Sequence, residues 1–385
     1  MTRSSLPLGT PVVVQPADLQ KLFDVLRARG YRVIGPTRRE GAIVHDELTS
    51  SAELPVGWTD VQDNGKYRLE RRTDNALFGF NNSSDAWKRY LNPPEQRVWQ
   101  AQLQDGAFQA FDLVDEPVVA DKLALMGVRP CDLRAIAAQD RVLLGSTFVD
   151  PAYKARRENI FIVAVNCSQA SGSCFCTSFQ TGPKAKSGYD LVLTEVIQDE
   201  RHFLVLRTGT EVGDDVIAEV PHQVAGPADL MAAVNVVDRT AGQIRRRLEI
   251  DGLAELVLKS YENPMWDQVA ARCMSCGNCT LVCPTCFCSN IEDTTDLAGT
   301  RAERWRKWDS CFNLEFSYIH GGSIRTSIYA RYRQWMTHKL ATFGAQFGTP
   351  GCVGCGRCIT WCPAGIDITE QARLLQEGVT RGEPA

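Results

Sequence analysis

Two copies of one cysteine pattern constrain this chain more than any other feature. The first copy, CMSCGNCTLVCP, spans residues 273–284, and the second, CVGCGRCITWCP, spans residues 352–363. Both have the form C-x2-C-x2-C-x3-C-P, the bacterial ferredoxin sequence that binds [4Fe–4S] clusters. Because the full spacing occurs twice, coincidence is a poor explanation. The chain is therefore expected to carry electrons.

The spacing also predicts which cysteines share a cluster. In such a run the first three cysteines surround one cluster and the fourth points toward the other. We therefore expect one [4Fe–4S] cluster on Cys273, Cys276, Cys279 and Cys362. A second is expected on Cys283, Cys352, Cys355 and Cys358. The alternative metal is zinc, which also takes four thiolates but usually from two separated C-x2-C pairs.

Four further cysteines point to a third centre. Cys131 follows an expected strand at 123–126, and Cys167 follows another at 159–165, with a helix expected between them at 132–143. Strands in this order usually lie parallel, with a right-handed crossover, so the loops after them meet at one edge of the sheet, where ligands bind. Cys174 and Cys176 follow Cys167 in a Gly/Ser-rich loop. We favour a third [4Fe–4S] cluster here; the alternative is a set of buried, apolar cysteines.

Three cysteines stay unassigned by the sequence. Cys286 and Cys288 lie directly after the first run, and Cys311 lies further on. Three thiols leave an open coordination position or form a reactive edge beside a cluster. Packing beside the clusters explains them equally well.

The pattern of elements predicts two domains. Residues 1–250 are expected to form an α/β domain with a mixed sheet that contains the strand–helix–strand unit. Segments 190–196 and 202–207 are expected to form a β-hairpin, and the polar stretch 54–75 a loop or an edge. Residues 251–385 are expected to form a mainly α-helical, two-cluster ferredoxin-like domain.

Helix signals recur throughout this second domain. Pro264 suits the first turn of a helix that runs into Cys273. Thr300 and Glu303 resemble a capping box for a helix through residue 312. Further helices are expected at 328–343, ending around residue 344, and from Asp367 onward. The 68 residues between the cysteine runs (284–351) are thus expected to be helical.

Composition excludes several other classes of function. The net charge is −4, and neither a signal peptide nor a run of 18 apolar residues is found, so a cytoplasmic protein without a membrane span is expected. No G-x-G-x-x-G follows a strand, which argues against a dinucleotide site in this chain. The basic, aromatic segment 325–339 has apolar residues at helical spacing. It therefore favours a packed helix with a solvated basic side, able to dock an acidic partner, over a nucleic-acid interface.

The chain resembles the β subunit of cytoplasmic NAD(P)-linked [NiFe] hydrogenases, also called sulfhydrogenases or sulfur reductases, and a relative among the components of anaerobic sulfite reductase. The resemblance covers most of the chain and lies in VRPCDLRAI (128–136), the NC…CFC segment (166–176), CMSCGNCTLVCPTCFC (273–288), WDSCF (308–312) and CVGCGRCITWCPAGIDI (352–368). It implies partner subunits that carry FAD, a nicotinamide site and nickel–iron.

The resemblance also implies a role without catalysis. In that family the β subunit relays electrons between the hydrogenase subunits and the flavin/NAD(P) subunit, and it does not itself split hydrogen. The near alternative is the same role in an anaerobic sulfite reductase. Two further hypotheses are that the chain itself reduces sulfur or polysulfide, and that it is a redox-responsive interaction module.

Overall fold

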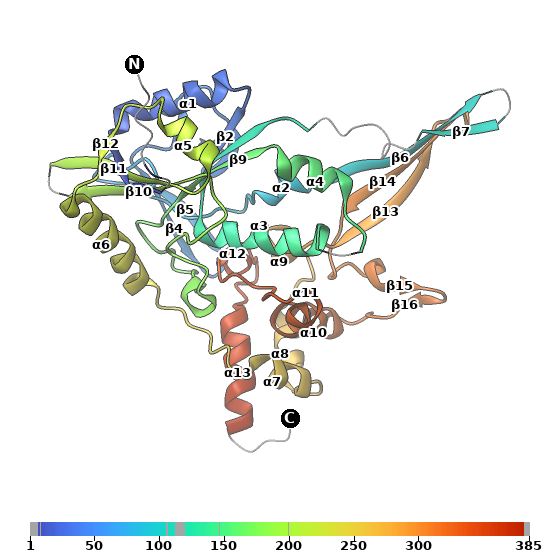
Figure 1. Cartoon of the computed structure of the whole chain (residues 1–385). Coiled ribbons are helices and arrows are strands. Elements are labelled where there is room, and N and C mark those ends of the chain that lie inside the picture. Colours follow the sequence, from blue (N-terminus) through green and yellow to red (C-terminus); the bar gives the residue numbers. More distant parts are fainter. Residues whose placement is uncertain are drawn as a thin grey trace.

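A mixed eight-stranded sheet organises the first half of the chain (Figure 1). The computed structural model describes residue 7 and residues 9–104, 107–111, 120–145, 147–198 and 200–380. The order across the sheet is β12 (Gln223–Val224), β1 (Val12–Val14), β11 (Arg201–Thr208), β10 (Leu191–Gln198), β9 (Ile160–Val165), β8 (Leu123–Val128), β2 (Arg32–Arg39) and β3 (Ala42–Glu47). The strands from β10 to β2 run parallel, and the outer pairings are antiparallel. The expected parallel pair and the expected hairpin are both confirmed.

Helices cover both faces of this sheet (Figure 1). Side chains alternate along a strand, so Phe161 and Val163 of β9 pack on one face while Ile162 and Ala164 pack on the other. The first face carries α1 (Leu19–Ala28) and α5 (Glu211–Ile217). The second carries α2 (Lys88–Leu91), α3 (Pro130–Leu143), α4 (Pro151–Glu158) and α6 (Pro227–Gln243). Short 3-10 turns lie at Pro16–Asp18, Ser51–Glu53, Cys176–Phe179 and Glu315–Ser317.

A second core gathers helices from the last third of the chain. They are α7 (Leu253–Lys259), α8 (Met265–Arg272), α9 (Asn278–Leu281), α10 (Ile328–Thr337), a π-helical turn (His338–Thr342), α11 (Phe343–Phe347), α12 (Arg357–Thr360) and α13 (Ile368–Thr380). Large buried side chains, among them Trp266, Tyr332 and Trp335, fill their common core. The helices expected before Cys273, at 328–343 and after Asp367 are confirmed, although the second continues to Phe347.

The expectation of a helix from Thr300 is wrong. Residues Arg301–Trp308 form the strand β14, which pairs with β13 (Ser289–Thr295) and with β6 (Glu95–Gln104), while β7 (Ala107–Phe111) pairs with β6. Thr300 does not cap a helix: its hydroxyl donates to the Asp296 carboxylate (2.6 Å) in the β13–β14 turn. Glu303 binds Arg97 of β6 (2.7 Å) instead of a helix amide.

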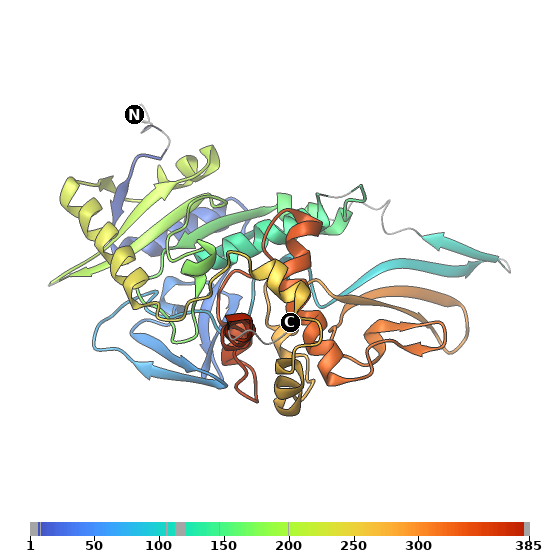
Figure 2. The same cartoon turned by 90° about the horizontal axis from the view of Figure 1, so that it is seen from below.

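These four strands form an arm that projects to one side of the molecule (Figures 1 and 2). Two smaller pairs complete the strands: β4 (Trp58–Asp63) with β5 (Lys66–Arg71), in the stretch expected as loop or edge, and β15 (Tyr318–Ile319) with β16 (Gly322–Ser323). The region after residue 250 is thus less helical than expected. Because the arm takes strands from both sides of residue 250, a domain boundary at that position stays a prediction.

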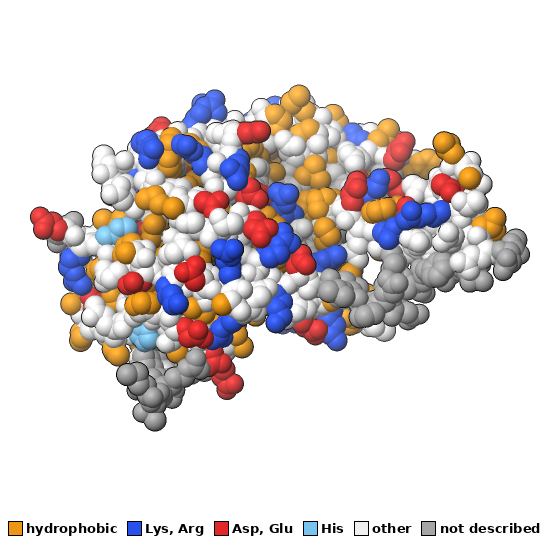
Figure 3. All heavy atoms as spheres, turned by 90° about the horizontal axis from the view of Figure 1, so that it is seen from above, with side chains coloured by type: hydrophobic (Ala, Val, Ile, Leu, Met, Phe, Trp, Pro, Cys, Tyr) orange, Lys and Arg blue, Asp and Glu red, His pale blue; other side chains and the backbone are white. Residues whose placement is uncertain are grey.

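The surface carries charges of both signs. Lys and Arg side chains are interspersed with Asp and Glu over the face seen in Figure 3. In the part of the chain that the structure describes, no helix is long and apolar enough to cross a membrane.

Candidate iron–sulfur sites

The two cysteine runs adopt the same backbone conformation. The second residue after the first cysteine has a positive φ in both runs, 52° at Ser275 and 64° at Gly354, and so does the glycine before the third cysteine, 76° at Gly277 and 79° at Gly356. The amides of Ser275 and Gly354 each lie 3.4 Å from the sulfur of the first cysteine of their run. A one-turn helix, α9 or α12, follows in each case. The sequence repeat is therefore a structural repeat that turns amide donors toward its sulfurs.

One set of thiols lines a cavity in the helical core. We call it the first group, and it consists of Cys273, Cys276, Cys279 and Cys362. Cys358 also lines the cavity, together with aromatic side chains such as Phe312 and Trp335. Burial, and then the neighbouring sulfurs of Cys273, Cys362 and Cys276, hold the pKa of the Cys279 thiol well above its ordinary value. Three cysteines of the first run thus lie beside the last cysteine of the second run.

The complementary set shows the same crossing. We call it the second group, and it consists of Cys283, Cys352, Cys355 and Cys358. Burial, and then the sulfurs of Cys352, Cys355 and Cys283, raise the pKa of the Cys358 thiol. The pKa of Cys352 rises to about 12, mainly through burial. The structure therefore brings these cysteines together in the two sets expected from their spacing, and their role as ligands stays a prediction.

The donor set of both groups suits iron–sulfur clusters. Each consists of thiols alone, which are the ligands of such clusters. Several buried thiols side by side cannot all ionise without a compensating positive charge, which a metal centre supplies. Among the described residues, no three Cys, His, Asp or Glu side chains stand ready to hold a single metal ion.

A third group collects at the carboxyl edge of the large sheet, and it consists of Cys131, Cys167, Cys174 and Cys176. Cys131 lies in the first turn of α3, directly after β8, and Cys167 follows β9. Burial raises the pKa of Cys174 to about 12, and the sulfurs of Cys167 and Cys355 add to this rise. Cys131 is affected in the same way by Cys355 and Cys176. The four thiols therefore lie close together and close to Cys355 of the second group.

Donors surround the third group. The Asn82 amide donates to the Cys131 sulfur (3.1 Å), and the Arg129 guanidinium donates to Cys167 and limits the rise of that thiol's pKa, which burial causes. Arg129 also donates to two backbone carbonyls, of Phe78 (2.9 Å) and Phe80 (2.7 Å), which fixes its position. A buried cation and an amide directed at sulfur fit thiolates better than neutral thiols.

The second run packs directly on the loop of the third group. A side chain at Gly356 would lie 2.4 Å from the carbonyl oxygen of Ser173, and one at Gly354 would lie 2.6 Å from that of Phe175. The Phe175 amide donates to the Gly354 carbonyl (2.9 Å). Glycine is therefore required at both positions for this close approach. The contact holds the second and third groups side by side.

Sequence reasoning missed the ion pair at this junction. Arg357, between Cys355 and Cys358, donates to both carboxylate oxygens of Asp132 (2.8 and 3.2 Å), and both side chains are 1% exposed. It also donates to the carbonyls of Ser83 (2.9 Å) and Asp85 (3.3 Å). Asp132 follows Cys131, so the pair ties the second group to the third. Nothing in the local sequence identifies two residues 225 positions apart as partners.

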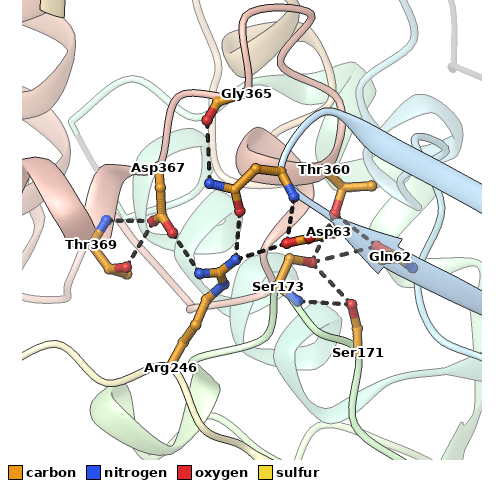
Figure 4. A network of polar contacts seen from close by, with 10 residues as sticks. Gln62, Asp63, Ser171, Ser173, Arg246, Thr360, Gly365, Asp367 and Thr369 are labelled. Carbon is orange, nitrogen blue, oxygen red and sulfur yellow. Dashed lines mark hydrogen bonds and ion pairs between the residues drawn. The ribbon is translucent and has the colours of Figure 1, made fainter.

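A polar network closes the other side of this junction (Figure 4). The Thr360 hydroxyl contacts Ser173 (2.7 Å) and Gln62 (2.9 Å). Arg246 donates to Asp367 (2.6 Å), whose carboxylate also accepts from the amide of Thr369 (2.8 Å). Residues from β4, the third-group loop and both ends of the second run are therefore joined by direct hydrogen bonds.

Cys286, Cys288 and Cys311 lie beside the second group rather than within the three groups. Asp309 donates its amide to the Cys288 carbonyl (2.9 Å), which extends the β13–β14 ladder and brings Cys311 to Cys288. Hydrogen bonding from Cys311 lowers the pKa of the Cys288 thiol to about 7, against the effect of burial.

Two buried lysines accompany these thiols. Lys339 donates to the sulfurs of Cys283 (3.1 Å) and Cys286 (3.5 Å). Lys88 donates to the Cys286 carbonyl (3.2 Å), and its ammonium lies 3.8 Å from the ring centre of Trp308. The packing expected of segment 325–339 is confirmed, but Lys339 is not on a solvated side of that helix.

Comparisons with known proteins agree with this geometry. Residues 272–366 match the family described as a 4Fe-4S dicluster domain. The chain is 30% identical over 368 residues to the sulfhydrogenase 2 subunit beta of Pyrococcus furiosus, covering 93% of this chain and 96% of the relative. The chain belongs to the sulfhydrogenase β-subunit family. No solved structure matches it. As a member of this family with a dicluster domain, it is an iron–sulfur subunit related to hydrogenase complexes.

Proposed function

We propose that the chain relays electrons between a [NiFe] hydrogenase module and a flavin- and NAD(P)-binding subunit. The observation that supports this is the crossing of the two runs, in which each group takes three cysteines from one run and the fourth from the other. Bound there, [4Fe–4S] clusters would supply one-electron transfer. The chain itself supplies the thiolates, the amide donors and a water-poor surrounding.

The ligand sets follow from the groups. The first and second groups would each hold one [4Fe–4S] cluster, and the third group would hold a third. Cys355 lies near both the second and third groups, and Cys279 and Cys358 line a common cavity. The three groups thus follow one another through the protein, as a relay requires.

The first group is the best placed to meet a partner. Cys276 is exposed, and its neighbour Met274 is 68% exposed. Cys131, Cys283 and Cys352 of the other groups are buried. A partner that docks over residues 274–281 would therefore come close to the first group without any rearrangement of the core.

Anaerobic purification tests this proposal. Two clusters predict about eight iron atoms and three predict about twelve per chain, with equal acid-labile sulfide. An absorbance band that bleaches on reduction is expected, and a colourless, zinc-loaded chain would refute the proposal. Affinity purification from native extract identifies the complex. Flavin- and nickel-containing subunits are expected, whereas sulfite reductase subunits would assign the same relay to a different reaction.

A further inference from the structure

Lys339 places a buried cation on one group of cysteines. Its side chain is almost fully buried, with 7% of the residue exposed. The ammonium nitrogen lies 3.1 Å from the Cys283 sulfur, 3.0 Å from the Thr285 hydroxyl and 3.0 Å from the Gly351 carbonyl. Because an ammonium has three N–H donors and no acceptor, these contacts use its full capacity. A sulfur atom is thus a principal partner of this charge.

A local change in helix geometry turns Lys339 inward. In α10 the buried side chains include Tyr332, Trp335 and Met336. The π-helical turn His338–Thr342 follows directly and contains Lys339. A π turn inserts one residue per turn and so rotates the following side chains about the helix axis. A cation buried this deeply is costly unless a negative partner faces it, and Cys283 as a thiolate is such a partner.

The two otherwise equivalent groups therefore differ in charge. Cys283 and Cys362 are the fourth cysteines of the two runs and occupy corresponding positions. Cys362 accepts only a backbone amide, from Ile366 (3.4 Å), in the hydrogen bonds found among described residues. Arg331 acts on Cys273 of the first group through its charge, but in the same part of the chain it donates to none of the first-group sulfurs. The direct ammonium–sulfur contact is thus a property of the second group.

We infer that Lys339 sets the reduction potential of the second group above that of the first. This rests on the proposed function, since it requires a cluster in each group. Reduction adds negative charge to a cluster and its sulfurs, so an ammonium in contact with one sulfur stabilises the reduced form more than the oxidised form. Lys339 is in this sense a positioning and tuning residue, and it makes the second group the favoured resting place of an electron.

An anaerobic redox titration followed by electron paramagnetic resonance tests the inference. In Lys339→Met, the ratio of reduced to oxidised second-group cluster at the wild-type midpoint potential is expected to fall about tenfold, equivalent to 59 mV for one electron. The first-group signal, identified by its change in Cys276→Ser, is expected to stay within about twofold. Lys339→Arg keeps the charge and should restore most of the shift.

Lys88→Met is the matched control. Lys88 is equally buried but contacts a carbonyl and an indole ring instead of a ligand sulfur. Its loss should therefore shift the second-group potential less than the loss of Lys339. Equal shifts in the two variants, or no shift in Lys339→Met at full iron content, would overturn the inference. If Lys339→Met loses iron, Lys339→Gln, which keeps an N–H donor without the charge, decides by the same criterion. A wild-type chain without two one-electron centres would instead overturn the proposed function.

Discussion

Removing the charge of Asp132 should destabilise the junction between the second and third groups. Asp132→Asn keeps the shape of the side chain but leaves the Arg357 guanidinium with two neutral carbonyls as its remaining partners, at Ser83 and Asp85. Both members of the pair are 1% exposed, so water cannot replace the lost carboxylate charge. Breaking a buried ion pair by removing one partner costs about 3–5 kcal/mol.

Guanidinium unfolding under anaerobic conditions, followed by tryptophan fluorescence, measures this cost. A loss of about 4 kcal/mol at a slope of about 6 kcal/mol/M lowers the midpoint by about 0.7 M. Asp293→Asn is the control, because Asp293 pairs with Arg304 on the surface and is 61% exposed. Exposed pairs contribute only about 0–1 kcal/mol.

The double variant separates charge from packing. Asp132→Asn combined with Arg357→Met strands no charge, so it should recover part of the stability lost in Asp132→Asn alone. Equal midpoints for Asp132→Asn and Asp293→Asn would refute the reasoning. That result would mean that the guanidinium finds a compensating charge elsewhere, for which Cys355 is the nearest candidate.

Three further outcomes are expected. Cys167→Ser should lower the iron content from about twelve to about eight atoms per chain, because it removes a ligand of the third group; unchanged iron would identify that group as buried thiols. Burial lowers the pKa of His45 from 6.5 to about 4, so only the unfolded chain binds this proton between those values. Stability should therefore be fully present above about pH 6.5 and fall by about 3 kcal/mol toward pH 4, and His45→Gln should flatten this dependence in pH-resolved unfolding. Alkylation of Cys288, followed by mass spectrometry, should have its pH midpoint near its pKa of about 7, and Cys311→Ser should move the midpoint upward; an unmoved midpoint would contradict the contact between the two thiols.

Local patterns identify much of the fold and the candidate site. The ferredoxin spacing forces its own backbone, because each run carries glycine where a positive φ is required, at Gly277 and Gly356. The apolar strands around α3 are also readable, since a fully buried parallel strand is a continuous apolar run. This placed Cys131 and Cys167 at one edge of the sheet.

Long-range contacts explain what the sequence did not predict. RAERWRKW (301–308) has no strong helical or alternating pattern, and its strand exists because β6, some two hundred positions earlier, offers an edge to pair with. Lys339 is expected on the polar side of a regular helix, and only the π turn brings it to Cys283. Neither a remote partner nor a local change of helical period leaves a signal in the neighbouring residues.

The arm of four strands has a consequence for the order in which the chain is built. While the ribosome is still translating the middle of the protein, the hairpin β6–β7 has already emerged, with the β6 edge that β14 will occupy still bare. That edge is covered only when residues 301–308 leave the exit tunnel. Non-local pairing of this kind is slow and exposes partly folded chains to aggregation. The stretch between Cys283 and Cys311 reaches its final place in the same late event, so iron–sulfur assembly factors would meet a nascent chain whose second cysteine run has yet to be made.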